Sequence, residues 1–223
     1  MKGTLPEYSK RQRFVNSMLE WGEKNRRRFP WRTERNPYTT LLAEILLQRT
    51  PAHRVAEFFP TFIKKFPTPH AIIMADSTEF QTYLASMGLK KRAQWLRSIM
   101  QDICDRNDCK IPQEEKELLA LRGIGPYTAR AVLCFGFGKD VGIVDINVAR
   151  VLSRVFLGTD VERKPAEDKI IWKLAEKLIP KNSGLLYNEA LLDFASLICK
   201  KTPQHSDCSI KDICRYFARK KHL

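Results

Sequence analysis

The stretch Leu-Arg-Gly-Ile-Gly-Pro-Tyr-Thr-Ala at residues 121–129 constrains the fold more than any other part of the sequence. Two glycines two positions apart permit the positive φ angles of a tight turn. Pro126 suits the first turn of a following helix, where its missing N–H group is not needed. Such a turn directs backbone N–H groups at the start of a helix toward an anion. An ordinary turn between two helices is the alternative for the Gly-x-Gly pattern taken alone.

Apolar residues recur at helical spacing along most of the chain, as in residues 53–66 and 93–103. Paired stretches of alternating apolar and polar residues, typical of strands, are absent from the sequence. Thr39 or Thr40 is the expected N-cap of a helix over residues 42–46, and Ser77 is that of the helix before Gly88. The pattern predicts an all-α protein of short helices.

The positive charge of the chain is concentrated near its two ends. The 223 residues carry a formal net charge of +14, and 43% of them are hydrophobic, as in a globular protein. Residues 1–36 hold ten Lys or Arg against four Asp or Glu, and residues 200–223 hold seven against two. Such a surface attracts polyanions. A solubilising tail is the alternative, and an anionic membrane is a weaker one because no long basic amphipathic helix is evident.

Two features indicate the cellular compartment. No apolar run approaches the ~20 residues of a membrane span, and the first residues lack the apolar region of a secretory signal. We therefore expect a cytoplasmic protein with no membrane partner. In such a protein, six cysteines favour metal or redox chemistry over disulfides.

Residues 121–129 resemble the helix-hairpin-helix of the DNA glycosylase superfamily that includes endonuclease III and MutY. The family carries a catalytic aspartate after the hairpin, and Asp145, 18 residues after Tyr127, matches it. Upstream, residues 29–32, 36–38 and 42–50 resemble the MutY-like branch. The resemblance runs from about Phe14 to the C-terminus.

The resemblance implies two helical domains. Residues 37–140 would form a six-helix barrel that contains the helix-hairpin-helix. Residues 1–36 and 141–223 would form the second domain, with an iron–sulfur-type loop rich in cysteine. The implied partner is duplex DNA with a mismatched or damaged base, bound by a monomer in the nucleoid.

The resemblance also implies a set of catalytic residues. Asp145 would stabilise the positive charge that develops on the deoxyribose when the C1′–N bond breaks. Its alternative is an ordinary N-cap for the helix that starts at Ile146, and both roles can coexist. Glu44, on an otherwise apolar helix, would contact the flipped base, with a surface residue as its alternative. Tyr127 stands where bifunctional members carry the lysine that forms a Schiff base, so the resemblance implies a monofunctional enzyme.

Other residues match positions of the family that touch DNA. Gln48 and Arg49 would fill the space vacated by the flipped base and contact the opposite base. Leu89 would act as an apolar wedge, with core packing as the alternative. Asn147 would orient the aspartate or close the helix turn. The full set of expected DNA-binding residues is Gln48, Arg49, Leu89, Gly123, Gly125, Thr128, Asn147 and Lys200.

The cysteine loop departs from the family pattern of four cysteines. The chain reads Cys199-x5-His205-x2-Cys208-x5-Cys214, so that His205 stands in the place of the second cysteine, with one residue fewer before it. A [4Fe-4S] cluster held by these four residues is the favoured interpretation. A zinc ion held by three thiolates and an imidazole, or no metal, are the alternatives. The expected role is structural, holding Lys200, Lys201 and Lys211 against DNA.

These observations together predict a monofunctional DNA glycosylase that removes thymine or uracil opposite guanine in base excision repair. The resemblance associates tyrosine at position 127 with archaeal-type thymine glycosylases, and MutY proteins carry a small residue there. MutY proteins also continue into a further domain after the cysteine region. A MutY-like adenine glycosylase acting on A:G or A:8-oxoG is one alternative. A DNA-binding helix-hairpin-helix module without catalysis is the other.

Overall fold

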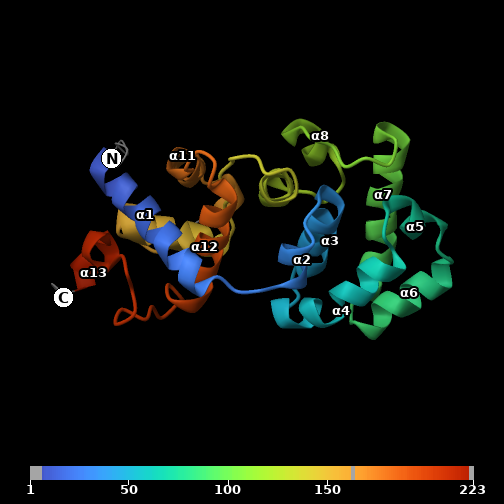
Figure 1. The fold of residues 1–223 in the computed structure, drawn as a ribbon, viewed down its shortest axis with the longest axis horizontal. Coiled ribbons are helices and arrows are strands. Elements are labelled where there is room, and N and C mark those ends of the chain that lie inside the picture. Colours follow the sequence, from blue (N-terminus) through green and yellow to red (C-terminus); the bar gives the residue numbers. More distant parts are fainter. Residues whose placement is uncertain (1–6, 162–163, 221–223) are drawn as a thin grey trace. The chain divides into compact units, whose positions relative to one another are not determined.

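The computed structural model describes residues 7–161 and 164–220, which form helices joined by loops and contain no strand (Figure 1). The predicted all-α fold is therefore confirmed. The chain divides into two compact units, Met1–Arg27 with Gly138–Leu223, and Arg28–Phe137. We call them the terminal unit and the barrel unit. The expected boundaries after residues 36 and 140 differ from this division by nine and three residues.

Residues 28–36 pack with the barrel unit because two aromatic side chains anchor them there. Trp31 stacks on Phe29 with ring centroids 4.7 Å apart and meets Phe59 edge-on at 5.6 Å. Helix α2 packs on both α3 and α4. The helices of the barrel unit are α2 (Pro30–Thr33), α3 (Pro37–Leu47), α4 (Ala52–Lys65), α5 (Pro69–Met74), α6 (Ser77–Ser86), η1 (Lys90–Arg92), α7 (Ala93–Asn107), α8 (Glu115–Ala120), α9 (Pro126–Ala131) and the π-helical turn η2 (Val132–Gly136).

Helix α3 is the buried centre of the barrel unit, and it begins earlier than the sequence pattern indicated. Its N-cap is Asn36, whose Oδ1 accepts a 2.9 Å hydrogen bond from the N–H of Thr39, while Thr39 Oγ1 accepts from the N–H of Asn36. Pro37 occupies the first helical position. The predicted Thr39 or Thr40 cap was wrong because this reciprocal pair starts the helix three residues before Thr40. At α6 the cap is likewise Asp76 and not Ser77.

The terminal unit joins the first helix of the chain to its last third (Figure 1). Phe14 and Tyr187 lie in one apolar core with ring centroids 6.4 Å apart. A Cβ atom on Gly22 would lie 2.5 Å from Cβ of Ala190, so the two backbones approach closely here. The helices are α1 (Tyr8–Asn25), α10 (Ile146–Leu152), the π-helical turn η3 (Ser153–Leu157), η4 (Pro165–Glu167), α11 (Lys169–Leu178), α12 (Gly184–Leu197), η5 (Lys211–Ile213) and α13 (Arg215–Lys220).

Part of the N-terminal positive charge is neutralised inside the terminal unit. Arg27 Nε donates to Oδ1 of the fully buried Asp193 at 2.7 Å, and Arg26 Nη1 donates to Oε2 of the buried Glu189 at 2.9 Å. These two arginines therefore fasten the end of α1 to α12. The sequence pattern had grouped them with the charges that attract a polyanion.

The structure contains a disulfide between Cys104 and Cys109, at the end of α7 and in the loop that follows. This finding corrects the preference for metal or redox chemistry at these two cysteines. The remaining thiols are Cys134, which is buried in the barrel unit as expected, and the three cysteines of the C-terminal loop. None of the helices in the described ranges has the length and hydropathy required to span a membrane.

Candidate DNA-binding and catalytic residues

The predicted hairpin lies between α8 and α9. Gly123 has a φ of +81°, which favours glycine, and its α-carbon faces the indole of Trp95. An added Cβ would lie 2.7 Å from Cζ2 of that indole, while Trp95 Nε1 donates a 2.7 Å hydrogen bond to the carbonyl of Arg122. Trp95 thus supports the turn by packing against Gly123 and by its hydrogen bond to Arg122. The sequence pattern did not reveal this role.

Gly125 differs from Gly123 in what it requires. Its backbone is extended (φ −95°, ψ 177°), a conformation open to any residue. An added Cβ would meet nothing within 4 Å. The fold itself therefore places no demand on glycine at position 125. A ligand that approached the backbone closely at this position would require glycine, because any side chain would collide with it.

The two residues after Pro126 differ in exposure. Tyr127 is half-buried at the start of α9. Thr128 is only 5% exposed, so its side chain belongs to the core of the barrel unit. The expected DNA contact of Thr128 is therefore limited to its backbone.

Asp145 is the N-cap of α10. Its Oδ1 accepts hydrogen bonds from the backbone N–H groups of Asn147 at 2.9 Å and Val148 at 2.7 Å. Its Oδ2 accepts a 2.7 Å bond from the side-chain amide of Asn147. The capping role that served as the alternative is thus present, and it fixes the carboxylate in one orientation.

Asn147 is itself held from behind by Arg150. Both terminal nitrogens of Arg150 lie 3.1 Å from Oδ1 of Asn147. Arg150 Nε donates to the carbonyl of Cys199 at 2.7 Å, and Nη2 donates to that of Ala195 at 2.9 Å. Because both ends of the Asn147 amide are engaged within the protein, the structure favours its orienting role over direct contact with DNA.

Four further predicted residues lie in the barrel unit, three of them in α3 or just after it. Glu44 is 8% exposed, so the alternative of a surface carboxylate is excluded. Gln48 is half-buried at the C-cap of α3, and Arg49 is exposed with a φ of +56°. Leu89 is only 5% exposed and packs in the core, as its alternative predicted. The structure as it stands offers no apolar wedge at Leu89.

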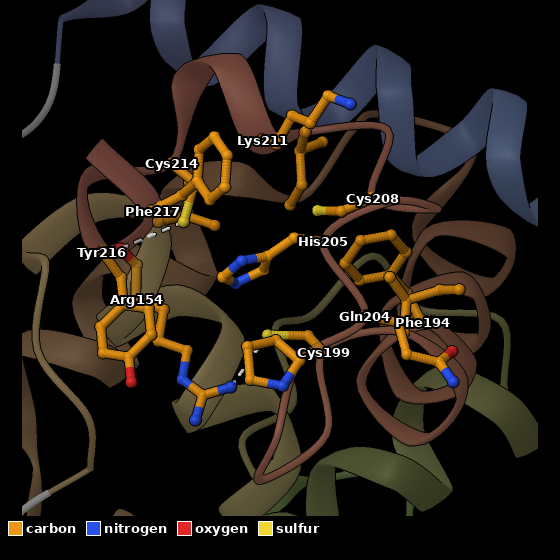
Figure 2. A pocket seen from close by; sticks show the side chains of 14 residues that line it. Arg154, Phe194, Cys199, Gln204, His205, Cys208, Lys211, Cys214, Tyr216 and Phe217 are labelled. Carbon is orange, nitrogen blue, oxygen red and sulfur yellow. Dashed lines mark hydrogen bonds between the residues drawn. The ribbon is translucent and has the colours of Figure 1, made fainter. Parts of the chain in front are cut away.

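The loop from Cys199 to Cys214 surrounds a small pocket of the terminal unit (Figure 2). In this view the imidazole of His205 lies between the sulfur of Cys199 and those of Cys208 and Cys214. The ring meets Phe217 edge-on with centroids 4.7 Å apart. The cavity has a volume of about 20 Å³, which is room for about one water molecule.

Arg154 fastens the start of this loop to η3. Its Nη1 lies 3.6 Å from the sulfur of Cys199 and donates to the carbonyl of Lys200 at 2.6 Å. Its Nη2 donates to the carbonyl of Lys201 at 2.9 Å, and Nε pairs with Asp160 at 2.6 Å. The side chain of Lys200 remains exposed, as a phosphate contact requires.

The side chains of Cys199, His205, Cys208 and Cys214 are of types that can bind a [4Fe-4S] cluster, but they are not arranged around a common site. Three soft thiols and an imidazole are ligands that iron accepts. Burial raises the pKa of Cys199, and it raises that of Cys208 to about 11. In the described part of the chain, however, no three His, Cys, Asp or Glu side chains are placed to hold a metal ion. In the view of Figure 2 the imidazole lies between the sulfurs, so these four side chains do not frame a site for a cluster.

Comparison with known proteins identifies the family. The family described as HhH-GPD superfamily base excision DNA repair protein matches residues 42–177, which include both the hairpin and Asp145. The chain belongs to the HhH-GPD superfamily. The resemblance stated from the motifs is confirmed, and the HhH-GPD match spans residues from both units.

Several HhH-GPD relatives match nearly the whole chain. A thymine/uracil-DNA glycosylase of Methanothermobacter thermautotrophicus is 34% identical over 94% of this chain and 96% of its own. An adenine DNA glycosylase of Buchnera aphidicola is 30% identical over 93% of this chain but only 59% of its own. A solved thermostable thymine-DNA glycosylase superposes with a TM-score of 0.89 at 33% identity, covering 95% of this chain and 98% of that one.

Proposed function

We propose that the chain is a monofunctional DNA glycosylase that removes thymine or uracil opposite guanine in base excision repair. The observation that carries this proposal is the carboxylate of Asp145, which three hydrogen bonds hold at the start of α10, 18 residues after Tyr127 of the hairpin. A carboxylate fixed in advance stabilises developing positive charge without having to reorganise during the reaction. The thymine and uracil glycosylases among the relatives support the choice of base.

The proposed reaction replaces one bond to C1′ of the deoxyribose with another. The C1′–N bond breaks and its electron pair leaves with the base, while positive charge develops on the sugar. The Asp145 carboxylate stabilises that charge. A water oxygen then bonds to C1′, and its proton passes to the carboxylate or to the departing base. Oδ1 accepts the two N-cap hydrogen bonds. Oδ2 accepts only the Asn147 amide within the described residues, so we assign Oδ2 to stabilise the charge on the sugar and to accept the proton.

Tyr127 and Glu44 have supporting roles in this proposal. A phenol cannot form the Schiff base that a lysine forms with the sugar, so strand cleavage by that route is excluded at position 127. Glu44 is 8% exposed on α3 and stands where the resemblance places a glutamate that contacts the flipped base. We assign it to contact the target base once the base leaves the stack.

DNA binding is assigned to the residues of the expected set that are exposed or half-buried. Arg49 and Gln48 follow α3, Gly125 leaves room for a close backbone approach, and Lys200 begins the basic C-terminal loop. We propose that a monomer binds mismatched duplex DNA in the nucleoid through these residues. Because phosphate contacts release counterions, affinity should fall by about a hundredfold or more between 50 and 200 mM salt.

We propose a structural role for the loop from Cys199 to Cys214, which Arg150 and Arg154 hold by its backbone carbonyls. Through Arg150 the first residue of the loop is tied to Asn147, and so to Asp145. Iron and zinc analysis of the purified protein tests the metal directly. A brown protein that bleaches on reduction contains the cluster, and a colourless protein without iron contains none.

A glycosylase assay on a set of duplexes tests the function. Duplexes with T:G, U:G, A:G and A:8-oxoG are incubated with the protein, and the abasic products are cleaved with alkali. We expect release of T and U, and none of A. Asp145→Asn should abolish release and retain affinity, because the amide oxygen still caps α10. Release of A alone would replace the proposal with an adenine glycosylase, and full activity of Asp145→Asn would exclude the catalytic assignment.

A further inference from the structure

The guanidinium of Arg92 lies at the C-terminal end of α3, within the barrel unit. Its Nη1 donates to the carbonyls of Leu46 at 2.7 Å and Ile45 at 3.2 Å, and it lies 3.1 Å from Oγ1 of Thr50. One nitrogen therefore binds three acceptors, two of them before residues 47–49 in the sequence and one after them. Within residues 7–161 and 164–220, no other side chain donates to these three acceptors.

These contacts complete the end of α3. The last four carbonyls of a helix lack partners within it, and a cation there also stabilises the helix dipole. Arg92 satisfies two of those carbonyls, while the N–H of Thr50 donates to the carbonyl of Leu47 at 3.1 Å. Thr50 Oγ1 donates in turn to the carbonyl of Gln48 at 3.4 Å. The path of the chain through Gln48 and Arg49 is thereby fixed on both sides.

The other end of Arg92 belongs to a basic turn over residues 88–92. The N–H of Arg92 donates to the carbonyl of Leu89 at 2.8 Å, and Gly88 enters the turn with a φ of +74°. Leu89 anchors the turn in the core, and Lys90 and Lys91 remain exposed. One side chain thus joins a turn that carries two exposed lysines to the segment that carries Gln48 and Arg49.

Arg49 depends on this arrangement more than its neighbours do. Its φ of +56° is uncommon for a residue with a side chain, so the surroundings must hold it there. Burial and the positive charge of Arg49 both lower the pKa of Arg92. Arg92 is held by carbonyls, whereas Arg49 is exposed.

We propose that Arg92 is a positioning residue for base extrusion, which holds the Gln48–Thr50 segment and the Lys90–Lys91 turn as one surface against the duplex. This inference rests on the proposed function, in which Gln48 and Arg49 occupy the space left by the target base. Arg92 touches neither DNA nor the reacting atoms in this role. It acts by fixing the backbone from which Gln48 and Arg49 reach.

Three variants separate positioning from general stability. Arg92→Met removes the donors and keeps most of the side-chain volume, Arg92→Lys keeps a cation, and Arg97→Met is the matched control. Arg97 lies in α7, the helix that begins directly after Arg92, and donates to the carbonyl of Ala75 at the end of α5. Both arginines therefore complete the C-terminus of another helix, but only Arg92 does so beside Gln48 and Arg49.

The direct readout is extrusion, followed by the fluorescence of 2-aminopurine placed beside a T:G mismatch. Base release under single-turnover conditions, affinity for a matched duplex and the unfolding temperature are measured in parallel. For Arg92→Met we expect release to slow by about tenfold to a hundredfold, since misplacement by about 1 Å suffices for that. The fluorescence rise should shrink, while affinity for matched DNA stays within about threefold. Arg92→Lys should recover part of both signals, and Arg97→Met should behave as the parent protein at equal unfolding temperature.

Each result decides between the possibilities. Normal extrusion and release by Arg92→Met, or equal losses in Arg92→Met and Arg97→Met, would overturn the positioning role. If Arg92→Met does not fold, Arg92→Lys and Thr50→Val replace it, and the same order of losses is required of them. If the parent protein extrudes the base and releases none, the proposed reaction fails, while the extrusion signal still tests Arg92.

Discussion

The side-chain amide of Asn147 donates a 2.7 Å hydrogen bond to Oδ2 of Asp145, while Oδ1 of Asn147 accepts hydrogen bonds from both terminal nitrogens of Arg150. The amide can take only one orientation in this arrangement, since its nitrogen must face the carboxylate and its oxygen the guanidinium. Arg150 extends the chain of bonds to the carbonyl of Cys199. The catalytic candidate is therefore oriented by residues that reach as far as the cysteine loop.

Asn147→Ala removes one of the three hydrogen bonds that orient the Asp145 carboxylate and keeps the two donated by backbone N–H groups. We expect the rate of base release under single-turnover conditions to fall by about tenfold to a hundredfold, because the carboxylate gains freedom to rotate. Affinity for a duplex that contains an abasic-site analogue should change by less than about threefold, because no contact with DNA is lost. Unchanged release would contradict the orienting role, and lost affinity would place Asn147 at the DNA surface.

Tyr127→Lys places an amine where the family's bifunctional members carry one. We expect a covalent adduct with abasic DNA after reduction with borohydride, together with strand nicking that the parent protein lacks. Tyr127→Met serves as the control, because it cannot form a Schiff base. Equal trapping of the parent protein would refute its assignment as monofunctional, and absence of trapping in Tyr127→Lys would show that position 127 does not face C1′.

The features that the sequence predicted correctly are local ones. The hairpin at residues 121–129, the helical pattern and the cap formed by Asp145 each depend on residues within a few positions of one another. The expected contacts of Leu89 and Thr128 with DNA assumed exposed side chains, but burial is decided by packing against distant helices. Sequence spacing alone does not contain that information.

The supporting arginines could not be predicted for the same reason. Arg92 and Arg150 bind carbonyls that lie between 45 and 49 positions away in the chain, and Arg92 also binds the hydroxyl of Thr50, 42 positions away. An arginine that donates to backbone carbonyls leaves no pattern, since every residue offers a carbonyl. Trp95 below Gly123 is a further case, because its partner in the hairpin lies 27 positions away.

The two glycines of the hairpin should respond differently to substitution by alanine. Gly123→Ala meets both a φ of +81° and the indole of Trp95, so we expect a loss of about 1–3 kcal/mol in the free energy of unfolding. Gly125→Ala meets neither and should change that free energy by less than about 0.5 kcal/mol. Urea denaturation measures both, and a gel-shift titration measures DNA affinity. Weakened binding by a stable Gly125→Ala would confirm that a ligand approaches there, and unchanged binding would refute it.

Arg154→Met tests whether the protein holds the cysteine loop by its own contacts. The buried guanidinium binds Asp160 and the carbonyls of Lys200 and Lys201, so its removal takes the donor from one carboxylate and two loop carbonyls. We expect the free energy of unfolding to fall by about 3 kcal/mol. Arg13→Met is the matched control, because its ion pair with Asp212 is exposed on both sides and should contribute less than about 1 kcal/mol. Equal, small losses in the two variants would show that the loop keeps its place without Arg154.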